Sequence, residues 1–75
     1  MITLKQAKRD FELGYLNKYR IERSPLKDGW VLILGERKAA GALVDARNKE
    51  PKVYKSLDSV ISALEDIGFA VNVLA

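Results

Sequence analysis

Apolar residues near the start of the chain recur every three or four positions, a spacing that places them on one stripe of a helix. The apolar positions of this stripe are Leu4, Ala7, Phe11 and Tyr15. Thr3 precedes the stripe and can accept a backbone N–H as an N-cap. Gly14 can adopt the left-handed backbone conformation that ends a helix. The pattern predicts a helix over residues 4–13.

The next segment, residues 18–24, alternates between apolar and charged positions. Tyr19 and Ile21 fall on one face, and Arg20 and Glu22 fall on the other. Alternation with period two is typical of a strand that is half in water, so we expect a strand here.

A turn and a second strand follow. Residues 25–29 contain a proline and an Asp-Gly pair, which favour a turn, so the two strands should form a hairpin. Residues 30–34 are apolar on both faces, which predicts a central strand covered on two sides by a second layer.

The middle of the chain is more polar. Residues 42–46 resume a strand-like pattern, residues 48–51 have the composition of a surface loop ending in proline, and residues 53–55 form a candidate short strand.

The last third predicts one more helix and one more strand. Ser56 is a candidate N-cap, Asp58 suits the positive end of the helix, and Gly68 can end it. The apolar stripe consists of Leu57, Val60, Ile61, Leu64 and Ile67. Residues 69–74 alternate as a final strand. The order α-β-β-β-(β)-α-β predicts one α+β domain over residues 1–75, a mainly antiparallel sheet packed with two helices.

The composition restricts the chemistry of this domain. The chain has no cysteine and no histidine, which removes thiolate and imidazole groups as nucleophiles, bases and metal ligands. Its serines lack a histidine partner, and Asp45 and Glu50 stand beside Arg47 and Lys49, where ion pairing explains them more simply than catalysis. We expect a protein that is not an enzyme and binds neither metal nor cofactor.

Length and hydropathy suggest a location and an assembly state. The longest apolar run, residues 30–34, is far too short to span a membrane, and the first residues lack the pattern of a signal peptide. We therefore expect a cytoplasmic protein with no membrane partner. A chain of 75 residues without disulfides or metal has a small core, so a homodimer is a further expectation.

The net charge of +3 is distributed unevenly along the chain. Basic residues dominate before residue 56, whereas residues 56–75 contain Asp58, Glu65 and Asp66 and no Lys or Arg. The basic part could contact phosphates, or it could be a solvated face of mixed charge. A double-stranded-RNA-binding domain is excluded because its second helix begins with basic residues, whereas here that turn is acidic.

Several residues have two interpretations. Trp30, Tyr19 and Tyr54 could stack on bases, but packing across strands is the simpler role of strand aromatics. Arg37 and Lys38 lie between two glycines and could form a basic finger or an ordinary exposed turn.

Three parts of the chain resemble a known group of proteins. These are the helix pattern Leu4-x-x-Ala7-x-x-Asp10-Phe11 with residues 19–23, the segment 44–47, and the segment 53–60 with the exit Ile67-Gly68-Phe69. They look similar to small accessory proteins of bacterial plasmids that are associated with partition or replication. The resemblance implies a role in plasmid maintenance, through DNA or through a partition or replication protein, and implies no catalytic residue.

The leading hypothesis is a non-enzymatic plasmid-maintenance accessory protein that acts by binding. If DNA is the partner, phosphate contacts are expected from Arg20, Arg23, Arg37, Lys38 and Arg47. The alternative is a protein-interaction module, a small regulator or inhibitor, that uses an apolar sheet edge or face to dimerise or to bind a partner protein. The final strand, residues 69–74, is one candidate for such an edge.

Overall fold

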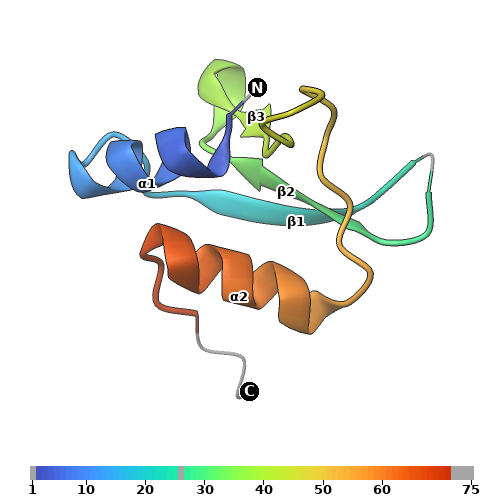
Figure 1. Cartoon of the computed structure of the whole chain (residues 1–75). Coiled ribbons are helices and arrows are strands. Elements are labelled where there is room, and N and C mark those ends of the chain that lie inside the picture. Colours follow the sequence, from blue (N-terminus) through green and yellow to red (C-terminus); the bar gives the residue numbers. More distant parts are fainter. Residues whose placement is uncertain (1, 26, 72–75) are drawn as a thin grey trace.

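The computed structural model describes residues 2–25 and 27–71 of the chain. In chain order the elements are α1 (Leu4–Glu12), β1 (Tyr19–Arg23), β2 (Trp30–Leu34), the short 3-10 helix η1 (Arg37–Ala39), β3 (Gly41–Ala42) and α2 (Leu57–Ile67) (Figure 1). The strands form one antiparallel sheet in the order β1-β2-β3, which confirms the predicted α+β class. Within the described residues, no helix is long and apolar enough to cross a membrane.

Helix α1 begins at Leu4, as the sequence predicts, and ends at Glu12, one residue before the predicted end. The Thr3 hydroxyl accepts the Gln6 N–H at 3.3 Å and the Gln6 side chain accepts the Thr3 N–H at 3.0 Å, a capping box that satisfies two free donors. Gly14 has φ +84° and turns the chain out of the helix. The expected place of Tyr15 on the buried stripe is therefore wrong: Tyr15 is 81% exposed, and Leu16 is buried instead.

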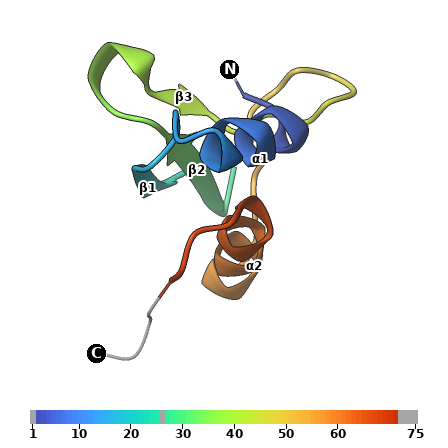
Figure 2. The same ribbon diagram turned by 90° about the vertical axis from the view of Figure 1, so that its left-hand side faces the viewer.

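The predicted hairpin is confirmed, with β2 at the centre of the sheet. β1 pairs with β2 from Tyr19 opposite Leu34 to Arg23 opposite Trp30, and β3 pairs with the far side of β2. Both helices lie on the same side of β2 (Figure 2). The predicted second layer is therefore present on one face only, since no described helix covers the other face of the sheet, which we call the open face.

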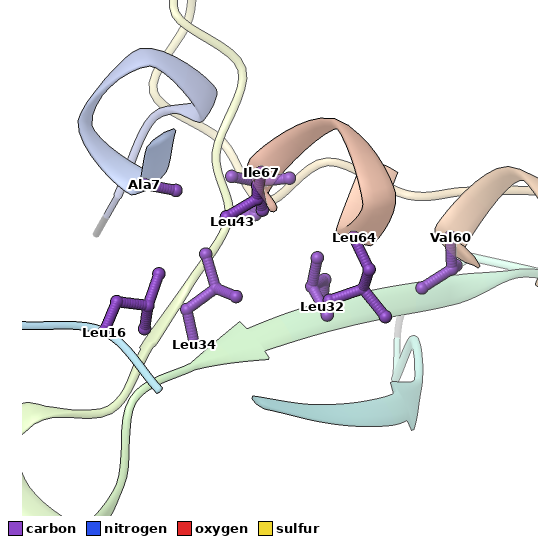
Figure 3. Packing of buried hydrophobic residues seen from close by; sticks show 8 residues of the cluster. All are labelled: Ala7, Leu16, Leu32, Leu34, Leu43, Val60, Leu64 and Ile67. Atoms are coloured by element: carbon purple, nitrogen blue, oxygen red, sulfur yellow. The ribbon is translucent and has the colours of Figure 1, made fainter. Parts of the chain in front are cut away.

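The core lies between the sheet and the helices. From β2, Leu32 and Leu34 point towards the helices, and Leu64 and Val60 of α2 meet them (Figure 3). All four side chains are fully buried, and burying a Leu or Val contributes about 1.5–3 kcal/mol. The complete buried cluster is Ala7, Leu16, Leu32, Leu34, Leu43, Val60, Leu64 and Ile67.

Helix α2 has the predicted cap and a slightly rotated apolar face. The Ser56 hydroxyl accepts the Ser59 N–H at 3.2 Å, and Gly68 with φ +132° ends the helix. Ala63 is buried as well, so the buried arc of the helix surface is centred between Val60 and Ile67. Leu57 consequently lies at the margin of this arc and is 45% exposed, not buried as its place in the predicted stripe suggested.

The remaining strands are shorter than the sequence suggested. The strand expected over 42–46 is β3 followed by single bridges at Leu43 and Val44, and the strand expected over 53–55 is one bridge between Tyr54 and Trp30. Residues 69–71 do not form a strand, and the Phe69 ring packs edge-on against Phe11 and Tyr19. The rest of that predicted strand, 72–74, lies outside the described residues.

Candidate protein-interaction surface

The open face of the sheet is defined by the pairing of the strands. Residues opposite one another in a ladder point to the same face, and neighbours along a strand point to opposite faces. Arg20 is opposite Ile33, Glu22 is opposite Val31, and Ile33 is also opposite Ala42. Because Leu32 and Leu34 face the helices, these five residues form the open face.

A groove with a volume of about 680 Å³ crosses the open face. Val31, on its floor, is buried, whereas Ile33 is half-buried. The apolar lining consists of Pro25, Val31, Ile33, Ala42, Pro51 and Val53. The polar lining consists of Glu22, Ser24, Lys27 and Glu50. The groove therefore combines an apolar floor with charged groups of both signs.

The chain beyond β3 forms part of the groove because it returns to the sheet. The Lys52 N–H donates to the Leu43 carbonyl at 2.9 Å, and Pro51 forms a bridge with Val44. Two residues later, the Tyr54 N–H donates to the Trp30 carbonyl at 2.8 Å and the Trp30 N–H donates back at 2.7 Å. These bonds fix the segment that carries Pro51 and Val53.

A second hollow of about 490 Å³ adjoins the groove. It contains charges of both signs, including Asp45 and Lys55. The Asp45 carboxylate accepts the Arg47 backbone N–H at 2.8 Å, and the ion pairs expected for Asp45 and Glu50 do not form among the described residues. Among the described residues, no group of three or more His, Cys, Asp or Glu side chains is arranged to hold a metal ion.

Two of the predicted DNA-contacting residues lie on opposite faces of β1. Arg20 is on the open face and forms an ion pair with Glu22, two residues along the strand. Arg23 is on the helix-covered face, where its guanidinium lies 4.9 Å from the centre of the Trp30 ring. Arg20 and Arg23 therefore do not form one basic face. Their odd spacing in a strand already indicates this, because it places the two side chains on opposite faces.

The other three predicted contacts are on exposed turns. Arg37 and Lys38 belong to η1, which follows the Leu34 end of β2, whereas Arg23 lies opposite Trp30 at the other end. Arg37 has φ +53°, an unusual backbone conformation for a residue with a side chain. Arg47 is exposed in the turn after β3. Of the five predicted DNA-contacting residues, only Arg37 and Lys38 lie next to each other, in η1.

The aromatic residues contribute to packing. Trp30 and Tyr54 pack against the buried cluster, and Tyr19 packs edge-on against Phe69 with ring centres 5.0 Å apart. Burial, and secondarily the Asp66 carboxylate, raise the pKa of Tyr54 above its ordinary value. These contacts favour the packing interpretation of the three aromatics over base stacking.

Sequence reasoning did not identify Pro25, Ala42, Pro51 or Val53 as parts of a surface. The one available signal was that Val31 and Ile33 alternate with residues of the opposite apolar face. The groups that converge on this surface are apolar side chains with charged residues around them. No protein-family model, curated protein or solved structure matches this chain.

Proposed function

We propose that this protein is a non-enzymatic protein-interaction module that binds an apolar segment of a partner protein in the groove of its open face. The observation that carries the proposal is the groove itself, which has a volume of about 680 Å³ and an apolar lining. A sheet face without a helix over it, with a half-buried Ile33 at its centre, retains apolar area that a partner can cover.

The shape of the groove favours a protein segment over a small ligand. Ligand pockets usually bury most of the ligand surface within a concave site. Here Ile33 and Val53 are both half-buried, so part of the apolar lining of the groove is open to solvent. An apolar centre surrounded by polar residues is the usual anatomy of a protein–protein interface.

The rim indicates the chemistry of the partner. Glu50 is exposed and takes part in no ion pair with any described residue, whereas Glu22 on the β1 side of the groove is already paired with Arg20. A partner segment with aliphatic anchors for the floor and a basic residue near Glu50 would complement the groove. The partition or replication protein implied by the resemblance is the partner that we propose to test first, and we propose the cytoplasm as the compartment.

The experiment is selection of binding peptides from a random displayed library, followed by affinity measurement with purified peptides. We expect selected peptides to share aliphatic anchors and a nearby Lys or Arg, and to lose at least about tenfold in affinity for Ile33→Lys or Val53→Lys. Leu13→Lys is the matched control, because Leu13 is an exposed apolar residue outside the groove. Peptides that bind Ile33→Lys as tightly as the unchanged protein would contradict the proposal.

A second candidate function is phosphate-mediated DNA binding through η1. The observation that favours it is that Arg37 and Lys38 are exposed neighbours with no ion pair to a described carboxylate. Their contacts would be to phosphates, so affinity should fall steeply with salt and be similar for all sequences.

Fluorescence anisotropy of labelled single- and double-stranded DNA, at low and at physiological salt, tests this second function. Replacing both Arg37 and Lys38 by Ala should reduce the affinity and the salt dependence together. Replacing Lys5 and Lys8 of α1 by Ala removes the same charge elsewhere and is the control. An affinity unchanged by the η1 double variant would remove this site from consideration.

A further inference from the structure

The outer edge of the sheet is strand β1. The sheet order is β1-β2-β3, so the other edge is at β3. That edge is partly occupied, because the Ile2 N–H donates to the Ala42 carbonyl at 3.1 Å and Ile2 forms a bridge with Leu43. No described residue outside the hairpin forms a backbone hydrogen bond with β1. A free edge of this kind can pair with another strand.

The register shows which backbone groups face outwards. The Gly35 N–H donates to the Lys18 carbonyl at 2.9 Å, and the Ser24 N–H donates to the Gly29 carbonyl at 3.0 Å. Hydrogen-bonded pairs alternate along an antiparallel ladder, so the even-numbered residues of β1 bond to β2. The N–H and C=O groups of Tyr19, Ile21 and Arg23 consequently point away from the sheet.

The side chains of β1 are complementary to a second, reversed copy of the same strand. Centring an antiparallel pair on Ile21 places Arg20 opposite Glu22 of the second copy, and Glu22 opposite Arg20 of the second copy. Both side chains are exposed on the open face, so each carboxylate would lie between two guanidinium groups. On the other face, Tyr19 comes opposite Arg23, which allows a contact between the cation and the ring.

The same pattern disfavours the neighbouring registers. The outward groups must oppose one another, so the two strands can slide only in steps of two residues. One such step places Arg20 opposite Arg20, and the step in the other direction places Glu22 opposite Glu22. Like charges directly opposite each other destabilise a strand pair, so the register centred on Ile21 is selected.

We propose that the protein forms a two-fold symmetric homodimer by antiparallel pairing of β1 with β1 of a second copy, centred on Ile21. The two-fold axis stands perpendicular to the sheet, so the two three-stranded sheets become one and their open faces lie on the same side. Each dimer then presents two grooves side by side. The dimer does not depend on what the groove binds.

Charge reversal at β1 tests the proposed pairing and its register. Arg20→Glu places carboxylates opposite each other, and Glu22→Arg places guanidinium groups opposite each other. Analytical ultracentrifugation should therefore show a dimer for the unchanged protein and about tenfold or more weaker self-association for each variant. Mixing the two variants restores both opposite-charge pairs, so a heterodimer should form. The double variant R20E/E22R should dimerise by itself.

Two controls separate this edge from other surfaces. Lys38→Glu reverses a charge outside β1 and should leave the dimer intact, and Val53→Lys, which tests the groove from a segment that does not pair with β1, should leave it intact as well. Circular dichroism confirms that the variants fold, which is expected because Arg20 and Glu22 are exposed. A monomer at high micromolar concentration, or single variants that dimerise like the unchanged protein, would overturn the proposal.

Discussion

The Cα atom of Gly68 faces the ring of Phe11 so closely that a Cβ at this position would lie 2.6 Å from Phe11 Cδ1 and Cε1. The Phe11 ring is held in place by Phe69, whose ring centre is 4.8 Å away in an edge-on contact. The end of α2 and the side of α1 thus meet through a glycine and two aromatic rings. This contact joins the two helices.

Gly68→Ala should destabilise the fold by about 2–4 kcal/mol. The methyl group would collide with the Phe11 ring, and φ +132° is a conformation that side chains rarely adopt. Gly14→Ala is the matched control, because Gly14 also has a positive φ of +84° but has no neighbour within 4 Å of an added Cβ. Gly14→Ala should cost about 1 kcal/mol, measured by urea unfolding. Equal losses for both variants would contradict the contact.

Leu64→Ala should remove a large part of the stability of this small domain. Leu64 is fully buried between α2 and β2, and such a deletion leaves a cavity that costs about 2–5 kcal/mol. Leu57→Ala removes the same atoms from the first position of the same helix, where the side chain is 45% exposed, and should cost less than about 1 kcal/mol. Thermal and urea unfolding of the two variants compare these losses.

Ser56→Ala should cost about 1 kcal/mol because it removes the cap of α2. The Ser56 hydroxyl accepts the Ser59 N–H, which would otherwise lack a partner at the start of the helix. Ser62→Ala, at an exposed position within the same helix, should change the free energy of unfolding by no more than a few tenths of a kcal/mol. A larger loss for Ser62→Ala than for Ser56→Ala would contradict the assigned cap.

The helix ends and the hairpin could be predicted from the sequence because their causes are local. Thr3, Ser56 and Gly68 act on residues within one helical turn, and β1 and β2 pair as neighbours in the sequence. The final strand was predicted from alternation alone. Residues 69–71 instead follow the contacts of Phe69 with Phe11 and Tyr19, which are far away in the sequence.

The candidate site depends on contacts that no local pattern specifies. Val31 and Leu32 are equally apolar in the sequence, yet only Leu32 faces the helices. The groove exists because Pro51 and Val53 return to the sheet through bonds at Leu43 and Trp30. In contrast, the opposite orientation of Arg20 and Arg23 follows from the period of a strand and was available from the sequence.

Tyr54 should make the stability of the protein fall at alkaline pH. Burial and the Asp66 carboxylate raise the pKa of Tyr54 in the folded state, whereas an unfolded tyrosine titrates near pH 10. The unfolded chain therefore loses its proton first, so this contribution to stability is fully present below about pH 10 and is lost as the pH rises through the folded pKa. Tyr54→Phe should flatten this part of the curve of unfolding free energy against pH. Asp66→Asn should keep most of the decline, because burial is the larger cause of the raised pKa. A decline that is unchanged in Tyr54→Phe would assign the alkaline loss to another group.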